Sequence, residues 1–165
     1  MEMPDTNLLL KNLAEEIRPA MNGNTCIVGI HTGGAWLAEK LHGMLGLKTP
    51  PGLLDISFYR DDFGRIGLHP EVKRSEIPFD VDDTDIILVD DVLHTGRTVR
   101  AAINELFDYG RPARIRLAVL VDRGGRELPI EPTFCAFRGV LDEEKMIDLV
   151  RNDSGLLELK FRSRE

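Results

Sequence analysis

The chain has 165 residues, of which 42% are hydrophobic and 30% are charged. This length suits one compact domain, here residues 1–165, and the composition excludes an intrinsically disordered chain. No apolar run approaches the roughly 18 residues of a membrane helix, and the acidic N-terminus does not resemble a secretion signal. With two cysteines and no disulfide framework, we expect a cytoplasmic protein without a membrane segment.

Helical and strand-like periods of apolar residues alternate along the whole chain. In order, the expected elements are a helix over 10–17, a strand over 26–30, a helix over 37–45, strands over 54–59 and 86–89, a helix over 99–107, strands over 117–121 and 134–137, a weaker helix over 143–150 and a strand over 156–161. Because the main strands are apolar without alternation, they predict an α/β fold with a mainly parallel sheet covered on both faces.

Ligands of such sheets bind beyond the carboxyl ends of the strands. Three breaks in the pattern are expected at that edge: residues 31–34, 90–98 and 122–125. A fourth segment, 60–78, contains glycines, prolines and mixed charges without a sustained period. A segment of this length without regular structure is uncommon in a compact domain unless it is functional or mobile.

The run IILVDDVLHTGRT contains the most informative pattern. Its four apolar residues deliver two adjacent carboxylates, Asp90 and Asp91, to the sheet edge, and a turn and a helix follow. In the turn, Thr95 and Thr98 offer hydroxyl donors, and Gly96 lets the backbone approach a ligand closely. Backbone N–H groups at the helix start add partial positive charge, so the run predicts a phosphate cradle beside carboxylates that bind a sugar diol.

Other proteins also place paired acids at a strand end. Receiver domains and magnesium-dependent phosphatases do so, and a purely structural role as a strand end with a helix cap is a further alternative. The Thr-Gly-x-Thr turn immediately after Asp91 favours a ribose phosphate over these interpretations.

The charge balance is 21 basic against 28 acidic residues, a net charge of −7. This balance argues against sequence-independent binding of nucleic acid, which needs a positive field. Five arginines nevertheless fall within residues 111–126, against a single acid, Asp122. Charge alone favours a solvated surface stripe, and leaves an anionic substrate or partner as the alternative.

The run 86–98 resembles the phosphoribosyl-pyrophosphate (PRPP) motif of type I phosphoribosyltransferases. Further segments resemble the PyrR family, bacterial pyrimidine operon regulators that also have uracil phosphoribosyltransferase activity. These segments are VGIHTGG from Val28, LDISFYRDD from Leu54, GRTVRAA from Gly96, GRPARIRLAVLVDRG from Gly110 and RELPI from Arg126. The resemblance covers residues 26–130 in register.

The resemblance implies a three-layer fold, with a mainly parallel central sheet flanked by helices, a small hood, and a flexible lid at about residues 60–78. It implies transfer of the phosphoribosyl group of PRPP to uracil or another nucleobase. UMP is then the product or an effector, and Mg²⁺ binds on the diphosphate of PRPP. It further implies a homodimer and a role in pyrimidine operon regulation through RNA.

The resemblance also assigns roles to individual residues. The phosphate and PRPP contacts would be His94, Thr95, Gly96, Arg97 and Thr98, together with Thr32, Gly33 and Gly34 of the pyrophosphate loop. Asp90 and Asp91 would bind the ribose hydroxyls near the magnesium complex, with no direct metal ligand assigned. Arg60 of the lid, or Lys73 or Arg74, would close on the diphosphate, and Asp122 and Arg123 would lie beside the base.

Four positions depart from the family pattern. Gly33 replaces an arginine of the pyrophosphate loop, and Gly125, Glu131 and Phe137 replace a histidine and two basic residues of the RNA-binding face. Fewer cations mean fewer phosphate contacts and less counterion release, so RNA binding is expected to be weaker. The alternatives to the uracil enzyme are an RNA-binding regulator that senses UMP with little catalysis, and a purine-type phosphoribosyltransferase.

Overall fold

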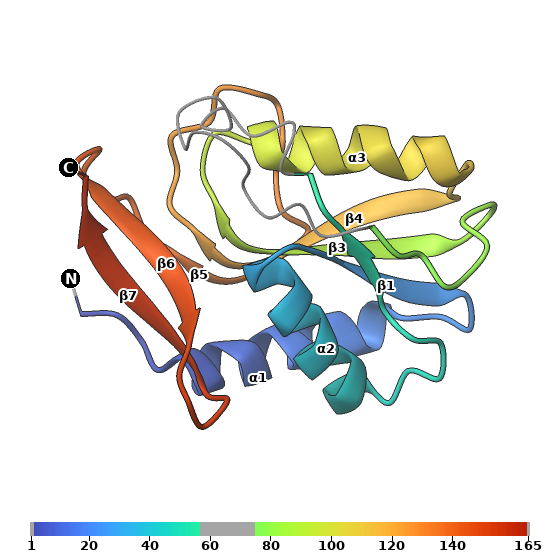
Figure 1. Cartoon of the computed structure of the whole chain (residues 1–165), viewed down its shortest axis with the longest axis horizontal. Coiled ribbons are helices and arrows are strands. Elements are labelled where there is room, and N and C mark those ends of the chain that lie inside the picture. The colour runs from blue at the N-terminus through green and yellow to red at the C-terminus, as the bar shows by residue number, and fades with distance from the viewer. Residues whose placement is uncertain (1, 57–74, 165) are drawn as a thin grey trace.

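The computed structural model describes residues 2–56 and 75–164. Its centre is a sheet of five parallel strands in the order β2-β1-β3-β4-β5. These strands are β1 (Thr25–Ile30), β2 (Gly52–Leu54), β3 (Asp85–Leu93), β4 (Arg114–Asp122) and β5 (Phe134–Arg138). A separate antiparallel pair, β6 (Lys145–Arg151) and β7 (Leu157–Ser163), stands at the end of the molecule where β3 and β4 finish (Figure 1).

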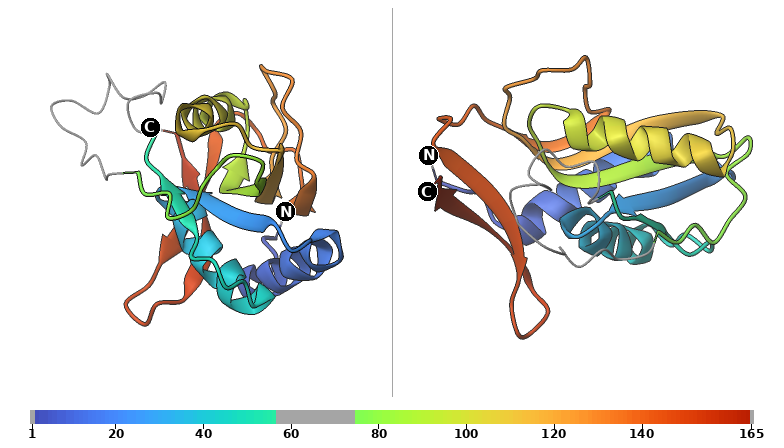
Figure 2. Two further views of the ribbon diagram at one scale, coloured as in Figure 1. Left: turned by 90° about the vertical axis from the view of Figure 1, so that its right-hand side faces the viewer. Right: turned by 45° about the horizontal axis from the view of Figure 1, so that its top comes forward.

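Helices cover both faces of the sheet and give the molecule three layers (Figure 2). The helices are α1 (Thr6–Ile17), the short 3₁₀ helix η1 (Arg18–Ala20), α2 (Gly33–Leu45) and α3 (Arg97–Tyr109). In β3, Ile87 and Val89 join the core formed with α1 and α2, whereas Ile86 and Leu88 join the core formed with α3. The predicted three-layer fold with a parallel sheet is confirmed, and no helix in the described ranges could span a membrane.

Most predicted elements are present, with ends shifted by a few residues. In the 54–59 segment, β2 ends at Leu54, and residues 57–59 lie outside the described residues. Most of the predicted lid also lies outside them, including Arg60, Lys73 and Arg74. Beyond that gap, Glu76 forms an antiparallel bridge with Leu53, with N···O distances of 2.7 and 2.8 Å.

The helix predicted over 143–150 is wrong, because this segment forms strand β6. Ile147 and Leu149 are buried in the core, while their neighbours Met146, Asp148 and Val150 are more exposed, which is the two-residue period of a strand. Pairing with β7 supplies the backbone hydrogen bonds, and Arg162 donates to Asp148 across the pair at 2.7 Å. The helix was predicted because four of the five residues at 146–150 are apolar, a spacing that is compatible with a helical period as well as with that of a strand.

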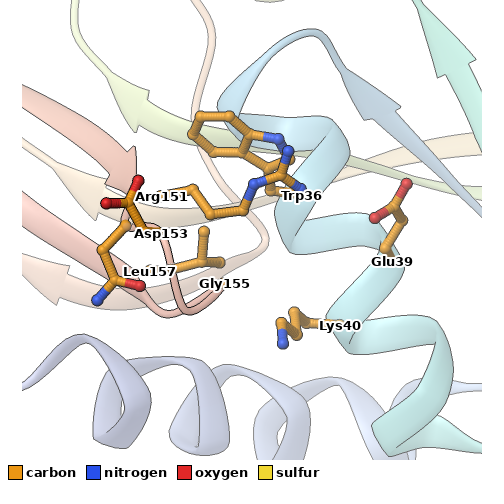
Figure 3. A pocket seen from close by; sticks show the side chains of 8 residues that line it. Trp36, Glu39, Lys40, Arg151, Asp153, Gly155 and Leu157 are labelled. Atoms are coloured by element: carbon orange, nitrogen blue, oxygen red, sulfur yellow. The ribbon is translucent and has the colours of Figure 1, made fainter.

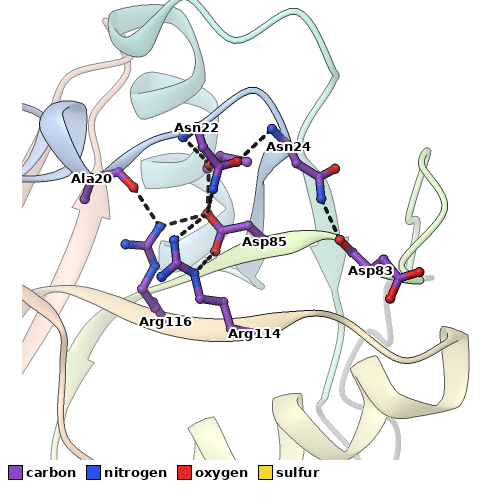
Figure 4. Close-up of polar contacts among 8 residues, drawn as sticks. Ala20, Asn22, Asn24, Asp83, Asp85, Arg114 and Arg116 are labelled. Carbon is purple, nitrogen blue, oxygen red and sulfur yellow. Dashed lines mark hydrogen bonds and ion pairs between the residues drawn. The ribbon is translucent and has the colours of Figure 1, made fainter.

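A buried carboxylate holds the amino ends of three strands together (Figure 4). Asp85 is 3% exposed and accepts hydrogen bonds from Arg114 Nε at 2.6 Å and Arg116 Nη2 at 2.8 Å. Thr25 Oγ1 donates to the same carboxylate at 2.9 Å. Two arginines of the predicted basic stripe therefore bind a buried carboxylate, at the end of the sheet away from the predicted site.

The charges around Asp85 control its titration. Burial raises the pKa of Asp85, but hydrogen bonds from Arg114 and Thr25 and the positive charges of Arg116 and Arg114 outweigh it. The pKa of this carboxyl therefore lies below its ordinary value.

We predict that Asp85→Asn lowers the free energy of unfolding at pH 7 by about 3 kcal/mol, because it leaves the largely buried Arg116 without its carboxylate. The contribution of Asp85 is complete above the unfolded pKa of about 3.9 and is lost as the pH falls through the lower folded pKa. In urea unfolding, the difference between the wild-type and variant proteins should accordingly shrink below pH 4.

Asp83→Asn, an exposed change two residues away, is the matched control and should leave the unfolding free energy nearly unchanged. Equal losses in the two variants would contradict a specific role for the Asp85 carboxylate.

Candidate active site

Close backbone packing brings the start of α2 against two strands. Strand β1 ends at Ile30 and α2 begins at Gly33, so much of the predicted 31–34 loop is the first turn of a helix. A Cβ atom at Gly29 would lie 2.5 Å from the carbonyl oxygen of Gly34, and one at Gly34 would overlap the carbonyl oxygen of Val89. Glycine at both positions therefore allows α2 to begin in direct contact with β1 and β3.

The acidic pair lies within β3, which continues past the predicted end at residue 89 to Leu93. Asp91 lies beside the start of α2, where a Cβ atom at Gly33 would overlap its carboxylate, and it accepts a hydrogen bond from Val92 N at 2.7 Å. Asp90 is 6% exposed, and its carboxylate accepts a hydrogen bond from Asp91 N at 2.9 Å.

A tight turn connects β3 to the start of α3. Gly96 precedes the helix with a φ of 93°, a left-handed conformation that favours glycine. Arg97 N donates to Thr95 Oγ1 at 3.2 Å, and Thr98 is half-buried in the first turn of the helix. The predicted helix start near Thr98 is correct to within one residue, so the backbone N–H groups of a helix start lie in this turn.

The segment 124–131 packs over this turn from the outside. Glu127 N and Leu128 N both donate to the carbonyl oxygen of Thr95, at 3.0 and 3.1 Å. Arg97 Nε donates to Glu127 Oε2 at 2.8 Å. The 94–98 turn is thereby held by backbone and side-chain hydrogen bonds from a loop more than 25 residues away in sequence.

The imidazole ring of His94 faces the same segment. His94 Nδ1 lies 2.8 Å from the carbonyl oxygen of Gly124. A carbonyl can only accept, so Nδ1 carries the proton in this arrangement. A Cβ atom at Gly125 would lie 2.5 Å from His94 Cε1, so the ring occupies the space that a side chain at position 125 would need.

The predicted base-side residues, Asp122 and Arg123, are both buried at the end of β4. Arg126 donates to both carboxylate oxygens of Asp122, at 2.8 and 2.6 Å, and Arg138 approaches at 3.3 Å. The hydrogen bond from Arg126 lowers the pKa of Asp122, and although burial opposes it, this carboxyl titrates below its usual range. Asp122 is therefore already engaged by protein cations, a pairing that its four-residue spacing from Arg126 allowed and our sequence interpretation missed.

Arg123 has a different environment. Its guanidinium donates to the carbonyl oxygen of Asp142 at 3.4 Å. Burial lowers the pKa of Arg123, and the positive charge of Arg164 acts in the same direction. Because β3 and β4 pair in register, with Leu93 opposite Asp122, this residue lies next to the end of the strand that carries the acidic pair.

The structure thus brings four predicted groups to one edge of the sheet: the helix start at 32–34, the acidic pair, the 94–98 turn and the 122–123 pair. They lie at the carboxyl ends of β1, β3 and β4, which are neighbours in the sheet. Within the described ranges, no group of three or more acidic, histidine or cysteine side chains forms a metal cluster. Two carboxylates next to helix starts suit a ligand with phosphates and hydroxyl groups.

A separate pocket of about 500 Å³ lies between α2 and the turn of the β6–β7 hairpin (Figure 3). Arg151 lies over the ring of Trp36, 4.9 Å from its centroid, and Lys40 and Asp153 also line the pocket. None of the predicted site residues lines it. Trp36, in the first turns of α2, therefore contributes to a surface pocket apart from the predicted site.

Comparison with known proteins identifies the family. A family model described as a phosphoribosyl transferase domain matches residues 4–147. A protein of Pseudomonas paraeruginosa named "Bifunctional protein PyrR" is 47% identical over 99% of this chain and 98% of its own length. The protein of the same name from Nitrosococcus oceani is 56% identical over 74% of this chain and 73% of its own length. The likeness therefore extends well beyond residues 26–130.

Solved structures support the same fold. A purine phosphoribosyltransferase from Pyrococcus horikoshii superposes with a TM-score of 0.61 at 24% identity, covering 90% of this chain and 93% of that chain. A hypoxanthine-guanine phosphoribosyltransferase from Bacillus anthracis has a TM-score of 0.65 at 16% identity, covering 87% and 83%. At these identities the likeness shows the fold and does not identify the base.

We predict that Gly34→Ala lowers the free energy of unfolding by about 2 kcal/mol, because the new methyl group pushes α2 away from β3. Gly43→Ala, in the same helix but with no atom near its Cβ position, should instead be stabilising by about 0.5–1 kcal/mol. Thermal and urea unfolding measure both. A Gly34→Ala protein as stable as the wild type would show that the helix start is not held by close contact.

Proposed function

Since the chain belongs to the phosphoribosyl transferase domain family and, within it, to the PyrR proteins, we propose that it transfers the phosphoribosyl group of PRPP to uracil, forming UMP and pyrophosphate. One observation carries this proposal: two helix N-termini lie on either side of the acidic pair. PRPP has a matching layout, with a diphosphate at C1 of the ribose, a phosphate at C5, and a diol between them.

In this proposal the turn from Thr95 to Thr98 and the start of α3 bind the 5′-phosphate. The start of α2, from Thr32 to Gly34, binds the diphosphate at the other end. Asp90 and Asp91 accept hydrogen bonds from the ribose hydroxyls between them. Because the arginine expected at Gly33 is absent and Asp91 occupies its space, backbone N–H groups supply the diphosphate contact at this position.

The reaction forms a bond between C1′ of the ribose and N1 of uracil and breaks the bond from C1′ to the diphosphate oxygen. The electron pair of the broken bond leaves with pyrophosphate, and the N1 proton is released to water. Positive charge builds on the ribose and negative charge on the leaving group. Preorganised N–H donors at the α2 start stabilise the second of these charges, as donors in an oxyanion hole do.

The acidic pair at the end of β3 has the donor atoms that magnesium prefers. Asp90 and Asp91 are two carboxylates, and Mg²⁺ in phosphate-transferring sites is typically bound by one or two carboxylates together with the substrate phosphates. When bound with PRPP, the cation neutralises charge on the diphosphate.

We expect the enzyme to work as a cytoplasmic homodimer, and sedimentation velocity tests its assembly.

A second activity, regulation of a pyrimidine operon through RNA, is suggested by the word "bifunctional" in the names of the relatives. The structure gives it limited support, because Arg114 and Arg116 bond Asp85 at one end of β4, and Arg123 and Arg126 are largely buried at the other. UMP-stimulated binding to a pyrimidine leader transcript would support regulation. Affinity that stays at the non-specific level of about 10⁻⁴–10⁻⁶ M would contradict it.

We predict that the protein incubated with PRPP, Mg²⁺ and a panel of bases converts uracil to UMP faster than it converts any other base. Chromatography of the product nucleotides measures this. Preferential formation of GMP or IMP would identify a purine enzyme on the same fold. An absence of turnover with every base would contradict the transferase proposal.

We predict that the double substitution Asp90→Asn with Asp91→Asn lowers kcat/KM for PRPP by about 100-fold or more, the size expected when charged contacts to the transition state are lost. Thr98→Ala should mainly raise the KM for PRPP. Asp108→Asn, an exposed change at the far end of α3, is the matched control. If neither site variant alters a demonstrated activity, the site assignment is wrong even though the family is correct.

A further inference from the structure

Arg126 has a set of contacts that its sequence position did not reveal. Its side chain is 17% exposed, and all five of its N–H donors have acceptors. Two donors bind the carboxylate of Asp122, and a long contact of 3.5 Å reaches Glu131. The other two bind backbone carbonyl oxygens: Nη1 reaches His94 at 3.1 Å and Nε reaches Ile130 at 2.6 Å.

Both carbonyl groups belong to residues next to the phosphate turn. His94 immediately precedes Thr95, and Ile130 packs against Gly96, where a Cβ atom would lie 3.1 Å from the Ile130 side chain. The carbonyl of Thr95 is bound in turn by Glu127 N and Leu128 N. Two successive carbonyl groups of the turn are therefore held from outside by residues 126–128.

The carboxylate of Asp122 anchors this arrangement to the sheet. Asp122 is the last residue of β4 and pairs with Leu93, the last residue of β3. A planar guanidinium that forms two bonds to one carboxylate has a fixed orientation. Arg126 thus connects the end of β4 to the turn between β3 and α3 through hydrogen bonds.

We propose that Arg126 is a positioning residue for the 5′-phosphate: it holds the 94–98 turn in its binding conformation before PRPP arrives. This inference rests on the proposed function, and it deepens that proposal by assigning a residue that acts through the turn without touching substrate. When the turn is already ordered, binding of the 5′-phosphate does not have to supply the free energy of ordering it. The loss of Arg126 therefore weakens binding of the 5′-phosphate more than it slows the chemical step.

Two variants test the inference. Arg126→Lys keeps the positive charge but loses the paired geometry. The double variant Asp122→Asn with Arg126→Met serves as the test if Arg126→Lys folds poorly. It removes the carboxylate charge together with the guanidinium and so leaves no uncompensated buried charge. In each variant we expect the KM for PRPP to rise at least tenfold. In Arg126→Lys, which keeps the predicted base-side residue Asp122, the KM for uracil should change less than twofold and kcat should fall less than threefold.

Arg116→Met is the matched control, because Arg116 also bonds a buried carboxylate and a backbone carbonyl, those of Asp85 and Ala20, at the opposite end of β4. This variant should lower the melting temperature while leaving the KM for PRPP unchanged. If the Arg126 variants behave in the same way, with an unchanged KM and a lower melting temperature, Arg126 has only a structural role and the inference is overturned.

Calorimetric titration with ribose 5-phosphate separates this inference from the proposed function. Weaker binding in the Arg126 variants, by tenfold or more, supports the positioning role even if the wild-type protein transfers to no base, an outcome that defeats only the proposed function. Binding that is equal in the wild-type protein, the Arg126 variants and the Arg116 variant overturns the positioning role, whatever the turnover assay shows.

Discussion

Direct contact between the first turn of α2 and the central strands is the constraint on which the site depends. Gly29 and Gly34 permit this contact, because a methyl group at either position would meet backbone atoms of the neighbouring element. Gly33 extends it to the carboxylate of Asp91. The helix start, with its partial positive charge, therefore lies beside an acidic side chain at the end of β3.

The second half of the site is the 94–98 turn, which a separate loop holds in place through hydrogen bonds. Helix α3 needs only Gly96 to begin, but the turn before it is held by residues 124–131 through the carbonyl groups of His94 and Thr95. The two halves share β3, which carries the acidic pair near its carboxyl end. A change in the register of β3 would therefore disturb both of the proposed phosphate-binding regions together.

Sequence patterns predicted the layers, the parallel sheet and the neighbourhood of the acidic pair, because buried parallel strands and phosphate turns have local signatures. They did not predict β6, whose apolar residues satisfied both a helical and a strand period until β7 supplied its partner. The five arginines within residues 111–126 were misinterpreted as one continuous stripe for a related reason. A nine-residue strand spans roughly 30 Å, so Arg114 and Arg126 lie at opposite ends of β4 and bind different carboxylates. Such pairings depend on tertiary geometry, which spacing along the chain does not contain.

The fit of His94 against Gly125 has an evolutionary consequence. The ring and any side chain at position 125 compete for one volume, and the positive φ of 80° there already disfavours other residues. A side chain at position 125 therefore requires the His94 ring to leave its place beside the Gly124 carbonyl group. The effect of a substitution at either position consequently depends on which residue occupies the other.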